Sequence, residues 1–301
     1  MPAALIIVNP AARAGRPLPK IVAAAAEALR HRGFATEIRT TENAGHATHL
    51  AARARVELVV AAGGDGTVNE VVSGLLKNPQ GTATLAILPT GTGNDVARLL
   101  GVRALPVALA ALAGNAVTSW DVIEISCRNA NAPVCRHALL FAGAGFVGDV
   151  IRQTTPRVKA WCGPTLSYAV GFFRALVRYR SCHLRVRGPG LTYDGPLLAA
   201  LAANAPHAGG GGMRLGPGAR MDDGAFDVSL IGSVTRGEVA RQFVRLTRGT
   251  HIHHRAVNYF PSAWLEIDAP HPLDVVADGE LIGQTPARFD LRPGALRLYR
   301  A

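Results

Sequence analysis

The sequence lacks several features, and each absence excludes a class of protein. No uninterrupted apolar run reaches the length of about 18–20 residues that a membrane-spanning helix needs. The first ten residues, MPAALIIVNP, lack the basic segment of a signal peptide and instead predict a buried strand. The four cysteines show no C-x-x-C spacing, which favours free thiols in a reducing cytosol over a disulfide framework. They are Cys127, Cys135, Cys162 and Cys182.

The composition is that of a folded, basic protein. The chain has 301 residues, of which 49% are hydrophobic and 18% are charged, and this excludes a disordered chain. Its 32 Lys and Arg residues outnumber 21 Asp and Glu residues, giving a net charge of +11. Such a charge suits nucleic acid, an anionic membrane surface or a phosphorylated small molecule, and composition alone does not choose among them.

The N-terminal part of the sequence alternates between strand and helix patterns. Strands are expected at residues 4–8, 34–40, 56–62 and 83–88, and helices at 18–32, 46–55, 67–76 and 94–100. This alternation predicts an α/β domain with a doubly wound, mostly parallel sheet.

After Trp120 the pattern changes to short alternating segments punctuated by glycine and proline, which predicts a mainly antiparallel β-sandwich or barrel. The expected strands are DVIEI, HALLF, CHLRVR, GPLLAALAA, AFDVSLI, AWLEID, DVVAD and ARFDL. Two helices are expected among them, at residues 164–179 and 236–247. The expected domains are therefore 1–119 and 120–301, with a return of the extreme C-terminus to the first domain as an option.

Three polar loops follow expected strands of the first domain, at residues 9–15, 63–70 and 89–95. The carboxyl ends of parallel strands meet at the sheet edge where ligands bind. Glycines in these loops would let backbone N–H groups approach a phosphate, and the helix starting near Thr67 would add the positive end of its dipole. Thr67 and Thr92 could cap helices or donate to phosphate oxygens, and Asp65 could hold Mg²⁺.

Neither of two common nucleotide motifs is present in these loops. No Gly-Lys-Ser/Thr follows, so the loop is not a Walker A loop, and the G-x-G-x-x-G fingerprint is also missing. A plain strand–helix turn explains any one of the loops equally well. Three such loops at one sheet edge favour phosphate binding.

The motifs taken in order resemble the diacylglycerol kinase catalytic family, in particular its bacterial lipid kinases, which are related to sphingosine and ceramide kinases and share GGDGT with NAD kinases. The resemblance rests on seven stretches that run through most of the chain. They are NP at residues 9–10, TENAGHA at 41–47, GGDGTVNEVVSGL, LPTGTGNDVARLLG, LSYAVGFFRAL at 166–176, GGGMRLGPGARMDDGAFDVSLI at 210–231 and DGE at 278–280.

This resemblance implies an NAD kinase/diacylglycerol kinase-like fold and a set of ATP-binding residues in the first domain. The implied residues are Asn9, Pro10, Ala11, Ala12, Arg13, Thr41, Gly64, Asp65, Gly66, Thr67, Val68, Asn69, Glu70 and Thr92. The family usually has Ser or Gly where this chain has Ala12 and Arg13, and Arg13 would be a new phosphate contact.

The resemblance also implies catalytic and metal residues in the second domain. Glu280 of DGE would be the general base that takes the proton of a lipid hydroxyl. Asp278 would lie on the same face if the segment is extended, and would orient Mg²⁺. From the residues alone, DGE is also a hairpin turn, which Asp-Gly favours.

A structural Mg²⁺ loop is implied at MDDG, with the Asp223 carboxylate and the carbonyls of Arg220 and Ala225 as ligands. The alternative is a solvated turn before the next strand. The family commonly has Asn where FAGAGF has Ala142, which affects the acceptor pocket.

Two further stretches have competing interpretations. HIHH at residues 251–254 could bind a metal, but without a nearby Cys or acid it is better explained as an exposed strand end. Residues 152–187 mix arginines with aromatic residues, which is typical of a surface that meets anionic lipid headgroups, and also of a solvated helix with an ordinary core stripe.

The sequence therefore predicts a lipid kinase that uses ATP and Mg²⁺, with diacylglycerol as the favoured acceptor. It would be cytoplasmic and peripheral at the inner membrane face, with no nucleic-acid partner and with a homodimer left open. The alternatives are a kinase of soluble substrates resembling NAD kinase, and a catalytically silent module that binds nucleotide or membrane.

Overall fold

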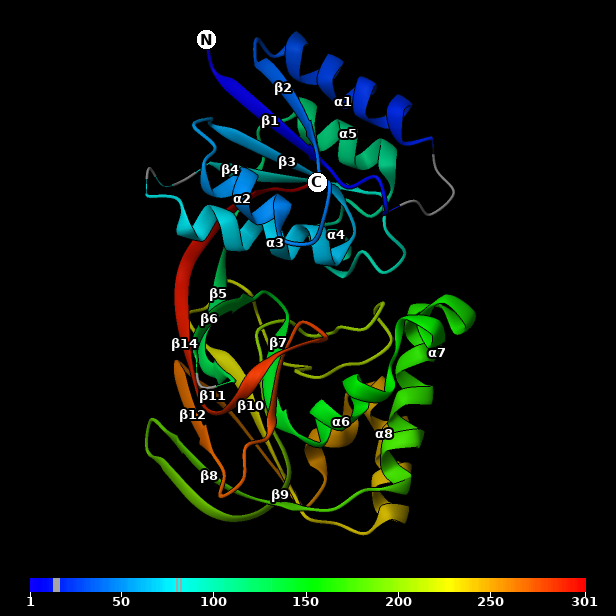
Figure 1. The fold of residues 1–301 in the computed structure, drawn as a ribbon, viewed down its shortest axis with the longest axis vertical. Helices are drawn as coiled ribbons and strands as arrows, with labels where there is room; N and C mark the ends of the chain where they lie inside the picture. The colour runs from blue at the N-terminus through cyan, green and yellow to red at the C-terminus, as the bar shows by residue number, and fades with distance from the viewer. Residues whose placement is uncertain (13–16, 80, 82, 131) are drawn as a thin grey trace. The chain divides into compact units, whose positions relative to one another are not determined.

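A computed structural model describes residues 1–12, 17–79, 81, 83–130 and 132–301, and its contacts divide the chain into two units. Unit 1 consists of Met1–Trp120 and Gly294–Ala301, and unit 2 of Asp121–Pro293. Figure 1 labels the helices and strands of both. Two long strands, β5 (Val117–Asn129) and β14 (Glu280–Tyr299), begin in one unit and end in the other.

Unit 1 is built on a parallel sheet with the strand order β2-β1-β3-β4-β14. Its other strands are β1 (Ala3–Val8), β2 (Ala35–Thr40), β3 (Leu58–Gly63) and β4 (Thr84–Pro89). Every residue of β3 and β4 is buried, as expected for parallel strands covered on both faces. Strand β1 lies between β2, which follows it in the chain, and β3. The strand order therefore reverses at β1, and the loops after β1 and β3 flank this point.

Five helices accompany this sheet within the described residues. They are α1 (Leu18–His31), α2 (His46–Ala52), α3 (Asp65–Lys77), α4 (Asp95–Leu99) and α5 (Leu105–Ala113). Helix α1 packs with α5, and α2 packs with α3. No helix is expected from the sequence at α5, because its residues are almost all apolar and give no helical alternation. Helix α3 begins two residues before the expected start at Thr67, so Asp65 lies in its first turn.

Unit 2 is rich in antiparallel strands, which confirms the β-rich second domain expected from the sequence. In addition to β5 and β14 its strands are β6 (Ala132–Ala138), β7 (Phe141–Gly145), β8 (Cys182–Gly188), β9 (Leu191–Ala203), β10 (Phe226–Gly232), β11 (Val257–Ser262), β12 (Trp264–Asp268) and β13 (Asp274–Ala277). The first part of β9 pairs with β8 and its last part with β7 and β10. Strand β14 pairs in the same way with β13 and then β12.

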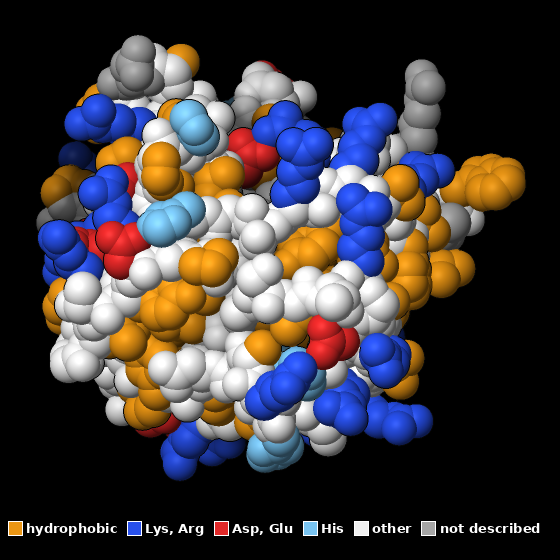
Figure 2. All heavy atoms as spheres, turned by 90° about the horizontal axis from the view of Figure 1, so that it is seen from below, with side chains coloured by type: hydrophobic (Ala, Val, Ile, Leu, Met, Phe, Trp, Pro, Cys, Tyr) orange, Lys and Arg blue, Asp and Glu red, His pale blue; other side chains and the backbone are white. Residues whose placement is uncertain are grey.

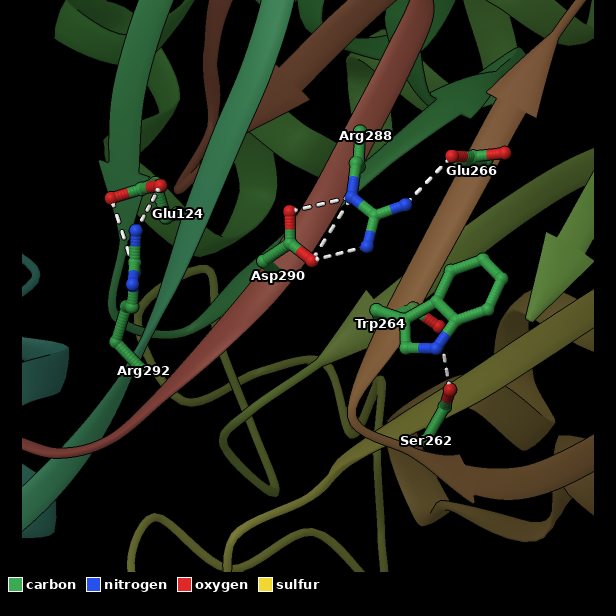
Figure 3. Close-up of polar contacts among 7 residues, drawn as sticks. All are labelled: Glu124, Ser262, Trp264, Glu266, Arg288, Asp290 and Arg292. Atoms are coloured by element: carbon green, nitrogen blue, oxygen red, sulfur yellow. Dashed lines mark hydrogen bonds and ion pairs between the residues drawn. The ribbon is translucent and has the colours of Figure 1, made fainter. Parts of the chain in front are cut away.

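The inward faces of these strands form one apolar core that includes Ile125, Leu184, Phe226 and Phe289. The outward face of β14 is polar. Arg288 contacts Glu266 of β12 at 2.7 Å and Asp290 at 2.8 Å, and Arg292 contacts Glu124 of β5 at 2.7 Å (Figure 3). Exposed ion pairs of this kind add little stability, but they match charges across the strand pairs.

One expected strand of unit 2 is wrong. The segment HALLF, residues 137–141, is not a single strand, because β6 ends at Ala138 and β7 begins at Phe141. The backbone bends at Leu139 and Leu140, where their amides bind a carboxylate described below.

The helices of unit 2 gather on one side of its strands (Figure 1). They are α6 (Phe146–Gln153), α7 (Pro156–Val177), α8 (Arg236–Arg248) and the short 3₁₀ helix η1 (Thr250–His253). Helix α7 begins earlier than the expected Pro164 and is kinked at Gly163, whose φ of 73° is not helical. The expected exposed strand end at HIHH is wrong, since η1 is helical and His251 is buried. No helix in the described part of the chain has both the length and the apolar character that crossing a membrane requires.

Candidate functional site

Three loops meet at the carboxyl edge of the unit 1 sheet, after β1, β3 and β4. The amide of Asn9 donates to the carbonyl of Ala62 at 3.0 Å, and the amide of Thr90 donates to the carbonyl of Gly63 at 3.1 Å. The structure therefore brings together the three glycine-containing loops that the sequence singled out. Arg13, the expected new phosphate contact, lies outside the described residues.

Glycine is required in two of these loops because they touch each other. A Cβ added to Gly64 would lie 3.2 Å from the Cα of Gly91, and one added to Gly91 would overlap the backbone of Gly64. A side chain at Gly63 would likewise overlap Thr67. Close packing of loop against loop is thus a second reason for the bare backbone, beside the approach of a phosphate.

Asp65 connects the same two loops through its carboxylate. Its Oδ1 accepts a hydrogen bond of 3.2 Å from the amide of Val96, and a Cβ on Gly93 would lie 2.7 Å from its Oδ2. Burial raises the pKa of Asp65 above its usual value, and the nearby charge of Asp95 raises it further. The carboxylate of Asp65 therefore holds the GGDG loop against the GTGND loop, in addition to any ligand that it binds.

The side chain of Asn9 fixes the first loop against the second. Its Nδ2 donates to the Oγ1 of Thr67 at 2.9 Å, while its Oδ1 accepts from the amide of Ala11 at 2.9 Å. The amide of Ala12 closes the turn by donating to the Asn9 carbonyl at 3.2 Å. Thr67 is buried and makes this contact from the first turn of α3, which has no side-chain cap. The first amides of α3 are therefore available to an anion.

Other residues of the expected nucleotide set have different roles in the structure. Glu70 accepts from the amide of Gly45 at 2.9 Å and from that of Ala47 at 3.2 Å, so its side chain caps α2. Val68 is buried in the core, and Thr41 is buried with its amide donating to the carbonyl of Val8 at 2.8 Å. Of the described members, three are exposed, namely Ala11, Gly66 and Thr92. Seven more are partly accessible, namely Asn9, Pro10, Ala12, Gly64, Asp65, Asn69 and Glu70.

In unit 2, residues 277–280 form a two-residue turn between β13 and β14. Asp278 and Gly279 have φ of 46° and 84°, as in the tight hairpin turns that Asp-Gly favours. The extended segment that would place Asp278 and Glu280 on one face is therefore wrong. The carboxylate of Asp278 accepts from the amides of Leu139 at 2.7 Å, Leu140 at 2.8 Å and Phe141 at 3.0 Å.

Glu280 differs from Asp278 in its surroundings. Its side chain is exposed, and no hydrogen bond or ion pair joins it to another residue that the structure describes. Beside it, a Cβ on Gly279 would lie 2.7 Å from the Oη of Tyr168 in α7. The turn thus presents one accessible carboxylate and packs against a tyrosine.

Tyr168 and Phe141, both adjacent to this turn, also line an apolar cavity of about 120 Å³ in unit 2. Its walls come from α6, α7, α8 and η1 on one side and from β7, β9, β10 and β11 on the other. The volume is comparable to that of an apolar cavity of about 150 Å³ that binds benzene. Nothing in the local sequence reveals this cavity, because its lining residues are spread over more than a hundred positions.

The MDDG loop is fastened to β5 by Asp121, a buried residue that lies in none of the recognised motifs. Its Oδ2 accepts from the amide of Gly224 at 2.8 Å, and its amide donates to the carbonyl of Met221 at 2.6 Å. Asp223 accepts from the amide of Ala225 at 3.2 Å, and the side chain of Arg220 contacts Asp222 at 3.3 Å. The loop offers carboxylate and carbonyl oxygens, the ligands that hard cations prefer.

A separate group of metal-ligating side chains lies on β5 and β6. One ligand atom each of Glu124, Cys135 and His137 lie within 4.8 Å of one another. The guanidinium of Arg292 contacts both oxygens of Glu124, at 2.7 and 3.2 Å (Figure 3). A cation already occupies this carboxylate, so the group is not assigned a metal.

Comparison with known proteins identifies the class. Residues 3–125 match the diacylglycerol kinase catalytic domain, and residues 144–300 match the YegS C-terminal NAD kinase beta sandwich-like domain. The chain therefore belongs to the diacylglycerol kinase catalytic family. Within it, the chain belongs to the bacterial lipid kinase branch, and it is a kinase whose acceptor is an alcohol. The resemblance stated from the sequence is confirmed.

The similarity extends over almost the whole chain. A probable lipid kinase YegS-like of Pseudomonas aeruginosa is 34% identical over 284 residues, covering 92% of this chain and 89% of that protein. A diacylglycerol kinase of Bacillus subtilis is 28% identical over 304 residues, covering 100% and 95%. A crystal structure of a diacylglycerol kinase from Bacillus anthracis superposes with a TM-score of 0.71 at 22% identity, covering 99% and 97%, and supports the fold.

Proposed function

We propose that the protein transfers the γ-phosphoryl group of ATP, with Mg²⁺, to the hydroxyl of a membrane lipid, with diacylglycerol as the acceptor. The observation that carries this proposal lies in unit 2. The exposed carboxylate of Glu280 sits on a turn that is held by Phe141 and Tyr168, and both of these residues line the apolar cavity. A base beside an apolar cavity suits an acceptor with an alcohol at one end and an acyl chain at the other.

In this proposal the loops of unit 1 bind the phosphates of ATP. The first amides of α3 face the sheet edge without a side-chain cap, and the helix dipole favours an anion there. The glycines at 64 and 91 keep the edge free of side chains. Of the nucleotide set, Gly64, Gly66, Thr67 and Thr92 are proposed as phosphate contacts, whereas Glu70, Val68 and Thr41 support the loops from behind.

Glu280 is proposed as the general base. As the acceptor oxygen bonds to the γ-phosphorus and the bond to the ADP oxygen breaks, Glu280 takes the hydroxyl proton. Asp278 is proposed as a positioning residue rather than a Mg²⁺ ligand, because three backbone amides already bind its carboxylate. Its contact with the Phe141 amide fixes the turn that carries Glu280.

Two carboxylates fit Mg²⁺. Asp65 has one oxygen engaged by the Val96 amide and stands at the phosphate-binding edge. Asp223 stands in the MDDG loop, where it accepts from the Ala225 amide, and the carbonyls of Arg220 and Ala225 are proposed as the further ligands. When bound near Asp65, Mg²⁺ would neutralise the charge of the transferring phosphoryl group. At MDDG it would order the loop that Asp121 anchors to β5.

An anionic membrane surface is the proposed partner of helices α7 and α8. Four apolar side chains of α7 and Val244 of α8 are exposed. The four are Trp161, which is 93% exposed, Val177, which is 71% exposed, Leu166 and Phe173. Leu166, Phe173 and Val177 follow each other at helical spacing, so they form one stripe. Figure 2 shows apolar side chains beside Lys and Arg on the side where α7 and α8 lie.

The basic residues next to this stripe are Arg174 of α7, Arg178 directly after this helix, and Arg241, Arg245 and Arg248 of α8, and all five are exposed. Apolar side chains that enter the interface and arginines that meet anionic headgroups act together in peripheral binding. This arrangement supports peripheral attachment, through which the enzyme would reach its lipid.

The proposed function is tested by incubating the protein with radiolabelled ATP and Mg²⁺ and, separately, diacylglycerol micelles, a total lipid extract and NAD. Labelled phosphatidic acid is the expected product, and labelled NADP would instead favour the soluble-substrate alternative. Glu280→Gln is expected to lower kcat by about 10²–10⁴. The exposed Glu27→Gln on α1 is the matched control and should leave the rate unchanged. Equal rates for both variants would refute the role of Glu280.

A further inference from the structure

Strand β2 lies at a free edge of the unit 1 sheet. It pairs with β1 along one side, and no described strand pairs with its other side. Backbone groups on the free side of an edge strand can pair with a strand of another chain. All residues of β2 except Thr36 are exposed, and Ile38 is 47% exposed. An apolar side chain is therefore accessible on a strand that has room for a further partner.

Two other described strands lie at an edge, and each contains a proline. Among the described strands, β6 pairs only with β5 and contains Pro133, and β11 pairs only with β10 and contains Pro261. Proline has no N–H to donate and is one of the features that keep edge strands from pairing with other chains. The sequence of β2 has no proline, so its edge lacks this protection.

The sequence of β2, ATEIRT, is complementary to itself when two copies run antiparallel. With Ile38 opposite Ile38 of a second copy, Glu37 of each copy faces Arg39 of the other. In the same register Thr36 of each copy faces Thr40 of the other. Opposite charges, apolar pairs and Thr–Thr pairs are cross-strand pairs that stabilise antiparallel strands.

Other registers of the two strands are less favourable. A shift of one residue would set a charged side chain opposite Ile38, and a shift of two would set like charges opposite each other, which destabilises a strand pair. Glu37 and Arg39 already point to the same face of β2, because their side chains form an ion pair of 2.5 Å. Both side chains are more than half exposed, so each is accessible to an opposite charge across a new strand pair.

We propose that the free edge of β2 is a dimerisation surface and that its partner is a second copy of this chain, bound by antiparallel pairing about Ile38. The pairing is symmetric and uses the same edge of both copies, so assembly stops at the dimer. One strand from each copy buries less than the roughly 1,200 Å² of a standard interface, so the dimer is weak, with a Kd of about 1–100 µM. The competing explanation is a monomer whose exposed charges protect the edge.

Analytical ultracentrifugation of the full chain at concentrations from about 1 to 300 µM tests the proposal. The wild type is expected to shift from monomer to dimer over this range and to form no larger species. Glu37→Arg sets arginine opposite arginine at two places in the strand pair and should raise the Kd at least about tenfold. Arg39→Glu should do the same by setting glutamate opposite glutamate.

Mixing the two variants gives the most specific test. An equimolar mixture of Glu37→Arg and Arg39→Glu chains should dimerise like the wild type, because every charge across the strand pair again faces an opposite one. Restored dimerisation would also show that both variants fold. A chain that carries both substitutions should form its own dimer for the same reason.

Arg103→Glu is the matched control. Arg103 is exposed and follows α4, where the amide of Ala301 after β14 donates to the carbonyl of Leu100 at 3.3 Å. Since β14 and β2 are at opposite ends of the strand order in the unit 1 sheet, this charge reversal should leave the Kd unchanged.

Three results would overturn the inference. They are a wild type that stays monomeric up to about 300 µM, a dimer that both single variants retain, and a mixture of the two variants that does not dimerise. None of these measurements requires kinase activity, so failure of the proposed function and failure of this inference are distinguishable.

Discussion

Replacing Asp278 by Asn distinguishes two possible roles of its carboxylate. One is to hold the turn that carries Glu280, and the other is to take part in the phosphoryl transfer. Asn has nearly the same size and tolerates the left-handed backbone, where Asp278 has a φ of 46°. The substitution therefore changes the carboxylate and little else. In the native protein one oxygen of Asp278 accepts from Leu140 and Phe141 and the other accepts from Leu139, at 2.7–3.0 Å.

The expected loss of stability follows from these three contacts. The Asn side chain keeps one oxygen for two amides, but its NH₂ group faces the amide of the third residue, so two donors oppose each other. Losing a hydrogen bond to a charged group costs about 1.5–3 kcal/mol, and the two remaining bonds weaken because their acceptor is neutral. We therefore expect Asp278→Asn to lower the free energy of unfolding by about 3 kcal/mol, a large part of the usual 5–15 kcal/mol.

Chemical denaturation and kinase assays on the same preparations check this prediction. Glu280→Gln is the matched partner, because Glu280 is exposed and lies two residues away. It should change stability by less than about 0.5 kcal/mol while removing most of the activity. If Asp278→Asn unfolded at the wild-type denaturant concentration yet lost as much kcat as Glu280→Gln, Asp278 would act in the chemistry and the present reasoning would be refuted.

Three further predictions follow from the structure. The pKa of His251 is about 4 in the fold and 6.5 in the unfolded chain, so below pH 6.5 the unfolded chain binds a proton that the fold does not. The free energy of unfolding should therefore be unaffected above pH 6.5 and fall by up to about 3 kcal/mol as the pH drops to 4. His251→Phe should flatten that part of a profile of melting temperature against pH. Gly91→Ala should cost about 1–3 kcal/mol by loop overlap, whereas Gly237→Ala, with open space around it, should stabilise by up to about 1 kcal/mol in denaturant unfolding. Val177→Asp should reduce sedimentation with anionic vesicles, while the exposed Val107→Asp in unit 1 should not; equal loss in both would contradict docking through α7.

The elements that the sequence predicts well are those whose burial leaves a clear pattern of apolar residues. Strands β1, β3 and β4 are short apolar runs, and the structure has them within two residues of the expected positions. Helix α5 is apolar on all sides and offers no period, and the bend at Leu139 and Leu140 depends on a carboxylate far along the chain. Neither could be read from local sequence, because each is determined by contacts with distant residues.

The same distinction holds at the candidate site. The glycine loops follow strands in one sheet, so topology alone predicts that they meet. The partners of individual side chains do not follow from order in the sequence: Glu70 turns away to cap α2, and His251 turns inward instead of ending a strand. The cavity is drawn from four helices and four strands, and so no single motif indicates it.

The acids of the recognisable motifs illustrate why a motif does not by itself establish a catalytic role. Asp65 binds the amide of Val96 and Asp278 binds three amides, and outside the motifs Asp121 binds the amide of Gly224, so each carboxylate joins two separate stretches of backbone. Removing any of them would move a loop as well as a charge, and a loss of activity on substitution to Ala would follow from either cause. Glu280 has no such contact among the described residues, so its substitution is the informative one. An acid that is conspicuous in the sequence but unengaged in the fold is the better candidate for chemistry, because a carboxylate exposed without a partner contributes little to stability.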